Sequence, residues 1–353
     1  MTRLVQRPRR RPPWLVAIAA AAMAATAACT DGSSSGSSSL AASAAIATPT
    51  APAPPSLSPD QPTATAEVTP ALAVVTATTL ATHLPGGLSR AVAIEIGGRI
   101  MVYGGFTDSG STTDAILRVD PSAGRVERSG HLAVRVHDAA GVALGDRTLI
   151  FGGGSAAPSS VVQEVDSSGA ARVIGTLPSA RADLSAVTVG NAAIVIGGGA
   201  SGVLDRRVLE TEDGIHFRTV ATLASGVRYA AVAQSGGRIY LIGGIGAAGE
   251  RAEIQRIDPS SGSVDVIGRT DQPISHASAI VIGGRLLLVG GRSEGKAQDG
   301  IWQVDLDTGA THLVGHLPQP VSDFSVAVLD GTGYLIGGET TTQIASIVAI
   351  DVR

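Results

Sequence analysis

A pair of adjacent glycines preceded by a short apolar run occurs six times in this chain. The first glycines of the pairs are Gly104, Gly152, Gly197, Gly243, Gly290 and Gly337. The steps between successive pairs are 48, 45, 46, 47 and 47 residues. A near-constant period in this range indicates one supersecondary unit repeated along the chain. The repeat therefore constrains the fold more strongly than any single motif does.

Three further landmarks keep step with the glycine pairs. A tripeptide such as His83-Leu84-Pro85 starts 21 residues before every pair, and a dipeptide such as Gly97-Gly98 starts seven residues before it. Dipeptides of Gly, Asp or Asn between apolar runs indicate tight hairpins, because these residues adopt positive φ at low cost. An acidic residue follows each pair by 13 to 16 residues. Four of these acids are followed by a turn-forming glycine, which predicts that they are turn residues: Asp120, Asp166, Asp258 and Asp305.

These landmarks divide each unit into four short strands. In the first unit we expect strands at Ala91–Ile96, Arg99–Tyr103, Ile116–Val119 and Arg125–Gly130. Four antiparallel strands in each of six units are typical of an all-β, six-bladed β-propeller. A solenoid is the alternative, but it needs polar capping repeats at its ends. No such caps are apparent in the sequence, whereas a propeller closes into a ring.

The sequence also predicts how the ring closes. The sixth unit ends at Arg353, just after its third strand, so its fourth strand is missing at the C-terminus. Residues 77–82 occupy a fourth-strand position in a unit that has no first three strands. We therefore expect this N-terminal strand to pair with residues 347–350 in the last blade, which removes two exposed strand edges.

The repeat resembles that of the kelch family, whose members have a double glycine at the end of the second strand. The resemblance covers about residues 71–353 and includes the acid that closes the third strand and the Leu-Pro element before the next unit. The chain departs from the family because residues such as Val119 replace the usual Tyr before the acid, and residues such as Val126 stand near the usual Trp. The resemblance implies a kelch-like propeller of four-stranded blades.

The first 28 residues have the pattern of a signal peptide. Several arginines precede an apolar, alanine-rich run from Trp14 to Ala28, which is short for a membrane-spanning helix. The only cysteine, Cys29, follows Ala27-Ala28 and resembles the cysteine of a bacterial lipobox, although Thr26 replaces the usual Leu. We expect cleavage before Cys29 and a diacylglyceryl anchor on its thiol. Ordinary cleavage after Ala27 or Ala28 and secretion is the alternative.

Residues 29–70 consist mainly of Ser, Ala, Thr and Pro, a composition with too little apolar bulk to form a core. We expect a disordered tether between the anchor and a propeller at 71–353, on the outer face of a bacterial cytoplasmic membrane. The net charge of −4 argues against nucleic-acid binding, which requires a basic stripe. Contact with the membrane is expected only through the lipid, and the propeller is expected to be a monomer.

The candidate site is the mouth of the central channel. In each blade the loops between strands 2 and 3 (the 2–3 loops) share a face with the loops that enter from the preceding blade (the 4–1 loops), and the 2–3 loops hold nearly all the length variation. Variable loops on a rigid scaffold are where binding usually resides. Each 4–1 loop also delivers one polar residue to the mouth. These residues are Arg90, Asp138, Asp183, Tyr229, His276 and Asp323, with Arg135, His137, Arg181 and Arg228 nearby.

The polar mouth has two interpretations: a ligand site, or side chains that are polar because they face water. Galactose oxidase-like chemistry is excluded, because its Cys–Tyr crosslink needs a cysteine and Cys29 lies in the leader. His83, His131 and His316 share one repeat position in different blades and cannot meet at one metal. No metal or cofactor is therefore predicted. Sialidase-type Asp boxes are absent, and aromatics are only 3% of the chain, which disfavours sugar chemistry.

Two classes of function follow from these observations. The first is a non-catalytic binding module for protein or peptide partners at the face that bears the 2–3 and 4–1 loops. The second is an enzyme at the channel mouth, either a hydrolase or a sugar isomerase like the kelch-type sialic acid mutarotases, on fold analogy alone. A deep pocket with a strongly perturbed carboxylate or histidine favours the enzyme, and a shallow, solvated mouth favours the binding module.

Overall fold

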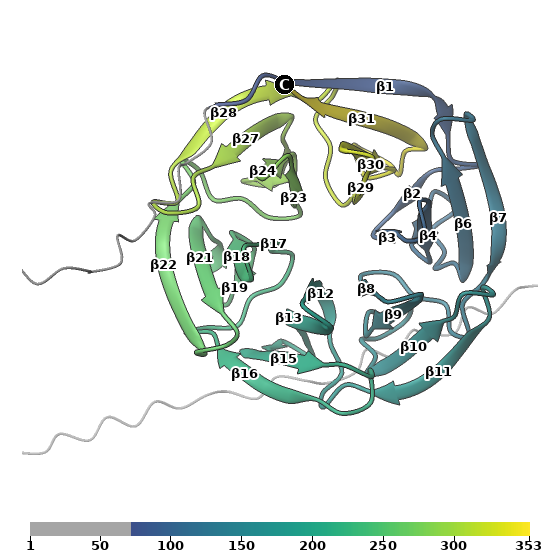
Figure 1. Ribbon diagram of the computed structural model, residues 1–353, viewed down its shortest axis with the longest axis horizontal. Helices are drawn as coiled ribbons and strands as arrows, with labels where there is room; N and C mark the ends of the chain where they lie inside the picture. Colours follow the sequence, from purple (N-terminus) through teal and green to yellow (C-terminus); the bar gives the residue numbers. More distant parts are fainter. Residues whose placement is uncertain (1–71) are drawn as a thin grey trace, which may run out of the picture. The chain divides into compact units, whose positions relative to one another are not determined.

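The computed structural model describes residues 72–353, which form six four-stranded antiparallel sheets arranged as a ring around a central channel (Figure 1). These residues form strands and no helix, which confirms the predicted all-β, six-bladed propeller. The predicted signal peptide (1–28), the lipidated Cys29 and the tether (29–70) lie outside the described residues.

The blades follow one another in chain order, and each runs from an inner strand at the channel to an outer strand at the rim. Blade 1 consists of β3 (Val92–Glu95), β4 (Ile100–Tyr103), β6 (Ala115–Asp120) and β7 (Arg125–His131). Blade 2 consists of β8 (Ala140–Leu144), β9 (Arg147–Phe151), β10 (Val161–Val165) and β11 (Ala171–Thr176). Blade 3 consists of β12 (Ala182–Val189), β13 (Ala192–Ala200), β15 (Arg207–Thr211) and β16 (Arg218–Thr222). Blade 4 consists of β17 (Ala231–Ser235), β18 (Arg238–Ile242), β21 (Glu253–Asp258) and β22 (Ser263–Arg269). Blade 5 consists of β23 (Ser278–Ile282), β24 (Arg285–Val289), β27 (Gly300–Val304) and β28 (Thr311–His316). Blade 6 consists of β29 (Ser325–Leu329), β30 (Thr332–Ile336), β31 (Ser346–Val352) and β1 (Val75–His83).

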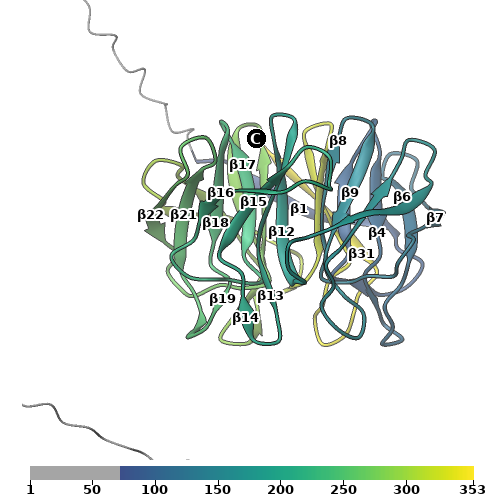
Figure 2. The ribbon, with the colours of Figure 1, turned by 90° about the horizontal axis from the view of Figure 1, so that it is seen from below.

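The 2–3 and 4–1 loops carry additional short strands that the sequence did not predict. They are β2 (Leu88–Ser89) with β5 (Phe106–Thr107), β14 (Val203–Leu204), β19 (Ile245–Gly246) with β20 (Gly249–Glu250), and β25 (Arg292–Ser293) with β26 (Lys296–Ala297). Seen from the side, β14 and β19 lie at the same edge of the ring (Figure 2). Pairs such as β2 with β5 join a 4–1 loop to the 2–3 loop of the same blade, so the two kinds of loop share one face, as predicted.

The ring is closed by its N-terminal strand, as the sequence predicts. Strand β1 pairs with β31 in an antiparallel register that places Ala77 opposite Ile350 and Thr79 opposite Val348. Val74 and Arg353 exchange two backbone hydrogen bonds of 3.1 and 3.0 Å at the end of this pair. The chain therefore contributes its first and last described strands to one blade, in which β1 forms the outer edge and covers β31.

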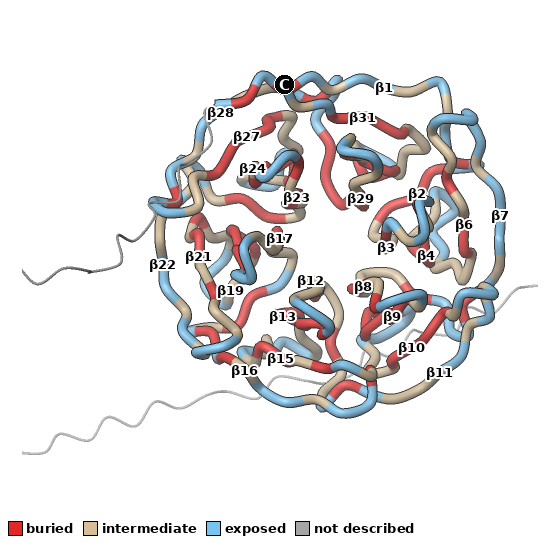
Figure 3. Tube along the Cα trace, in the orientation of Figure 1, coloured by how far each residue is buried: buried red, intermediate tan, exposed pale blue. Residues whose placement is uncertain are grey.

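The core consists of apolar layers between neighbouring blades, while the outer strands are largely exposed (Figure 3). One buried cluster, for example, joins Leu149 and Phe151 of blade 2 to Val195 and Leu209 of blade 3. A comparable cluster joins blades 6 and 1, so the closing seam is packed like the other interfaces. The leucine of the tripeptide landmark is buried wherever it occurs. These leucines are Leu84, Leu132, Leu177, Leu223 and Leu317.

The glycine pairs are where each blade touches the next. In every pair, the second glycine donates its N–H to a backbone carbonyl in the 4–1 loop that enters the following blade, as Gly244 does to Ile274 at 2.8 Å. The first glycine lies so close to the same carbonyl that a Cβ atom on Gly243 would stand 2.1 Å from the Ile274 oxygen. A side chain at this position would force the blades apart, which explains why the pairs recur.

The repeated acids at the outer turns have the predicted role. The Asp120 carboxylate accepts hydrogen bonds from the Ala123 N–H and the Ser122 hydroxyl, both at 2.8 Å. Asp305 accepts from the Thr308 N–H at 2.8 Å in the same way. These bonds close the turns between the third and fourth strands, far from the channel.

Candidate functional site at the channel mouth

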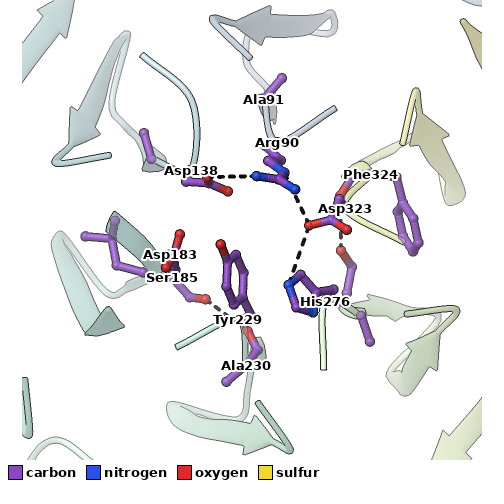
Figure 4. A pocket seen from close by; sticks show the side chains of 14 residues that line it. Arg90, Ala91, Asp138, Asp183, Ser185, Tyr229, Ala230, His276, Asp323 and Phe324 are labelled. Atoms are coloured by element: carbon purple, nitrogen blue, oxygen red, sulfur yellow. Dashed lines mark hydrogen bonds and ion pairs between the residues drawn. The ribbon is translucent and has the colours of Figure 1, made fainter. Parts of the chain in front are cut away.

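All six predicted mouth residues line one pocket on the channel axis (Figure 4). Five of them lie in a 4–1 loop shortly before the inner strand of their blade, and Asp183 is the second residue of the inner strand β12, so the six-fold repeat brings one side chain from every blade to the opening. We call this set of six the mouth ring: Arg90, Asp138, Asp183, Tyr229, His276 and Asp323.

The backbones of the mouth ring form a closed circle of hydrogen bonds. The N–H of each member donates to the carbonyl of the member in the preceding blade, at 2.8 to 3.1 Å. The circle is completed where Arg90 of blade 1 donates to Asp323 of blade 6 at 2.8 Å. The positions of the six side chains are thus set by one continuous backbone element rather than by six independent loops.

Every member of the mouth ring has a left-handed backbone, with φ between 53° and 62°. Only nine non-glycine residues among the described residues have positive φ, so the ring accounts for most of them. Asp tolerates this conformation comparatively well, but for Arg, Tyr and His it costs roughly 1–2 kcal/mol each. Glycine would remove the cost, and this chain contains 45 glycines.

One side of the mouth contains a charge-balanced network that spans blades 1, 5 and 6. Arg90 and Arg292 both contact Asp323 and Glu339, with nitrogen–oxygen distances from 3.0 to 3.7 Å. The Ser89 hydroxyl donates to Glu339 at 2.8 Å, and the Ser322 hydroxyl donates to Asp323 at 2.7 Å. Burial of Glu339 opposes its ionisation, but the Ser89 hydrogen bond and the two guanidiniums outweigh burial and lower its pKa.

The opposite side of the mouth is less well balanced. The Asp138 side chain is 10% exposed, and its nearest basic groups, Arg90 Nη1 and His137 Nε2, are 3.6 and 3.5 Å from its Oδ2. Burial first and the neighbouring Asp183 second raise the pKa of Asp138 to about 7, and Arg90 only partly opposes this rise. Asp138 therefore changes its charge near neutral pH.

Tyr229 and His276 pack together in the mouth with ring centroids 3.9 Å apart and planes inclined by 24°. Burial and the carboxylates of Asp138 and Asp183 raise the pKa of Tyr229 far above its usual value, so the hydroxyl stays protonated. Burial lowers the pKa of His276, and Asp323 opposes this shift without reversing it. At neutral pH the pair is an uncharged aromatic surface beside the carboxylates.

The pocket is small and open. Its cavity volume is about 110 Å³, whereas sites that enclose a free small ligand usually measure about 300–1,000 Å³. A cavity of this size accepts one functional group or one side chain, and the surrounding loops must hold the rest of any ligand.

Two site residues were missed by sequence reasoning, namely Arg292 and Glu339. Each directly follows a glycine pair, at the start of a 2–3 loop, where the other blades have uncharged residues such as Phe106 and Ile245. The signal was present as two ionisable side chains of opposite sign at one repeat position in adjacent blades. The length variation of the 2–3 loops obscures this signal.

Of the four ionisable residues expected near the mouth, Arg228 contacts Asp183 at 3.4 Å and His137 contacts Asp138 at 3.5 Å, whereas Arg135 is exposed. The side chain of Arg181 is fully buried and pairs with Asp205 and the Gly197 carbonyl. Its position in the repeat is apolar in the other five blades, as at Val136 and Val227, and it faces the protein interior. Arg181 is therefore a structural residue of blade 3.

Within residues 72–353, no three His, Cys, Asp or Glu side chains are grouped as metal ligands. His83, His131 and His316 lie on the outer strands β1, β7 and β28 of different blades, as their repeat position predicts. The described part of the chain has no helix that could span a membrane.

Comparison with known proteins supports the fold. No protein-family model and no curated protein matches the chain. A solved structure titled "Structure of YjhT" is similar, with a TM-score of 0.67 and 13% sequence identity over 77% of this chain and 99% of that chain. At this level of identity the similarity concerns the β-propeller architecture and not a shared ligand or activity.

Proposed function

We propose that this protein is an extracytoplasmic, kelch-like propeller that acts as a non-catalytic binding module for a protein or peptide. The partner binds at the face that bears the 2–3 and 4–1 loops, with the mouth ring at its centre. Cys29 carries the lipid that anchors the module, and residues 29–70 form the tether. The kelch repeat is the family resemblance that fits the four-stranded blades and their glycine pairs.

The observation that carries this proposal is the retained backbone strain of the mouth ring. Arg90, Tyr229 and His276 keep left-handed backbones that glycine would adopt without strain. Strain of this kind persists where the surrounding structure enforces it and is concentrated at functional sites. Retaining six polar side chains there indicates that the side chains themselves are used.

The size of the pocket favours a macromolecular partner over a free metabolite. A cavity of about 110 Å³ encloses one side chain, and the 2–3 loops around it provide the additional contact area that a specific interface needs. In such interfaces a few central, desolvated contacts contribute most of the affinity. We expect one partner side chain to enter the mouth ring and the loops to contact its neighbours.

Affinity capture with matched variants tests this function. The purified protein and a variant with Asp138, Asp183 and Asp323 all changed to Asn are used to capture partners from the cell envelope. The control variant carries D146N and D330N in hairpins on the opposite face of the propeller. A partner held by wild type and control but lost from the mouth variant supports the proposal. Equal capture by all three proteins contradicts it.

The predicted anchor has its own test. Mass spectrometry of the membrane fraction should detect an acylated Cys29, and Cys29→Ala should move the protein into the soluble fraction. An unmodified thiol on a secreted protein would instead support ordinary signal-peptide cleavage after Ala27 or Ala28.

One observation favours the alternative of a mouth enzyme, namely the Asp138 pKa of about 7. A carboxyl group that titrates near neutral pH suits proton transfer, as in sugar mutarotation or hydrolysis. Exchange spectroscopy with free sugars, comparing wild type with Asp138→Asn, tests this candidate. Acceleration of anomer exchange by wild type and not by the variant would favour the enzyme.

A further inference from the structure

We propose that the group bound in the mouth is a cation of the partner, an ammonium or guanidinium group, held between the carboxylates of Asp138 and Asp183. This inference rests on the proposed binding function and specifies the chemistry of its central contact. It follows from the charge balance, the burial and the free hydrogen-bonding capacity of the mouth residues.

The charge balance of the mouth leaves one carboxylate in excess. Three carboxylates (Asp138, Asp183, Asp323) and one guanidinium (Arg90) line the pocket. Ion pairs with these groups add one carboxylate, Glu339, and two guanidiniums, Arg228 and Arg292, so the network has four carboxylates and three guanidiniums. His137 and His276 do not supply the missing charge. Burial lowers the pKa of both, aided by Arg90 at His137 and by Arg292 and Arg90 at His276. A bound cation would balance the site.

The excess is located at Asp138 and Asp183. Arg90 and Arg292 are already shared between Asp323 and Glu339, which leaves Asp138 with one arginine contact, to Arg90 at 3.6 Å, beside its 3.5 Å contact with His137. Asp183 has only Arg228 as a cationic partner, at 3.4 Å, and the Arg228 side chain is 46% exposed. A contact with an exposed, mobile guanidinium is weak in water. Both side chains are 90% buried and line the pocket (Figure 4). Asp183 also accepts a hydrogen bond from the Tyr229 hydroxyl, and a carboxylate offers about four acceptor positions, so both groups retain acceptor capacity.

The same arrangement disfavours an anion. A carboxylate or phosphate would have to displace Glu339 or Asp323 from Arg90 and Arg292, and these acids are also fixed by Ser89 and Ser322. It would then lie beside Asp138 and Asp183, where like charges repel at short range. A cation meets acceptors that are already in place.

Protonation of Asp138 gives the inference a signature. Without ligand, the proton held by Asp138 removes the excess charge, and its pKa is about 7. A cation requires the ionised carboxylate, so binding must expel this proton wherever it is present. Below about pH 7 the affinity should therefore fall by about tenfold per pH unit, and above it the affinity should level off.

Selection from a random peptide library displayed with free N-termini tests the inference on the purified full chain. We expect wild-type protein to enrich peptides with Lys, Arg or an exposed α-amino group at one fixed position. Replacing that Lys by Gln, or acetylating the N-terminus, should weaken binding by about tenfold or more. Asp138→Asn should remove both the preference and the pH dependence, since Asn keeps the left-handed backbone without the charge.

Asp330→Asn is the matched control, because Asp330 also has a left-handed backbone, φ 51°, but lies in a hairpin on the opposite face. It should leave selection and pH dependence unchanged. Enrichment of acidic or uncharged peptides would overturn the cation inference while leaving the binding function intact. Failure to enrich any peptide above background would contradict both. Equal loss of peptide binding in Asp138→Asn and Asp330→Asn would show that both variants fold poorly. Calorimetric peptide binding by a third variant, Asp183→Asn, then decides between the outcomes.

Discussion

The two ends of the inner strands solve the same backbone problem in opposite ways. At the 1–2 hairpins, the chain turns through left-handed residues, and nine of the ten with positive φ are glycines, as at Gly97 and Gly284. At the mouth ring, the chain also passes through left-handed residues, and none of the six is glycine. The local geometry is similar, so the difference lies in whether a side chain is needed there.

Surroundings explain the difference further. A Cβ atom at Gly97, Gly237 or Gly284 would have open space around it, so the hairpin glycines serve only the backbone. The mouth positions instead direct their side chains into a shared pocket, where they contact one another. The hairpin face of the propeller thus minimises conformational strain. The mouth face tolerates strain of about 1–2 kcal/mol for each non-glycine residue that is unfavourable in the left-handed conformation.

The largest expected effect on stability comes from opening the ring of blades, because both faces of the propeller depend on its closure. Deleting residues 71–84 removes β1, exposes β31 and opens the mouth ring between Arg90 and Asp323. We expect loss of cooperative folding of the whole domain, because all blades depend on closure. Thermal unfolding followed by circular dichroism measures this, with deletion of residues 40–60 as a control expected to melt like wild type. A β1-deleted protein that melts at the wild-type temperature would disprove closure by this strand.

A pair of glycine substitutions compares close blade contact with backbone strain alone. Gly243→Ala places a Cβ 2.1 Å from the Ile274 carbonyl oxygen, whereas Gly237→Ala meets nothing within 4 Å, and both residues have positive φ. Gly237→Ala should lower the free energy of unfolding by about 1 kcal/mol because of its backbone conformation. Gly243→Ala should lower it by about 3 kcal/mol or more because the next blade must shift. Chemical denaturation gives both values. Equal costs would mean that the glycine pairs are needed only for their backbone conformation.

The pH dependence of stability distinguishes a mouth aspartate from a hairpin aspartate. Burial raises the folded-state pKa of Asp138 from its ordinary value of 3.8 to about 7. The folded protein therefore holds a proton that the unfolded chain releases, and this contribution to stability is lost as pH rises toward 7. Asp138→Asn should stabilise the protein at about pH 8 by on the order of 2 kcal/mol and have little effect near pH 4. Asp330→Asn should show no such trend in denaturation at the two pH values.

How much of this could be predicted from sequence depends on whether a feature repeats. The blades, the hairpins, the Asp120-type turns and the six mouth positions each recur at fixed offsets, so one unit predicts the others. The β1 closure followed from one unmatched strand. Arg292, Glu339 and the buried Arg181 are exceptions to the repeat, and their partners are set by the neighbouring blade in space. The raised pKa of Asp138 also depends on side chains from blades far apart in sequence.

The smallest effect tests the strain at the mouth directly. At an ordinary position Ala is more stabilising than Gly, because Gly loses more conformational freedom on folding. At Tyr229, with φ 53°, Ala retains the left-handed strain and Gly removes it. Tyr229→Gly should therefore be about 1 kcal/mol more stable than Tyr229→Ala, although both variants lose the stacking on His276. Urea denaturation of the two variants measures the difference, and since both lack the same side chain, the lost contacts cancel. If the Ala variant is the more stable, the mouth ring is not strained, and its polar side chains no longer mark a binding site on conformational grounds.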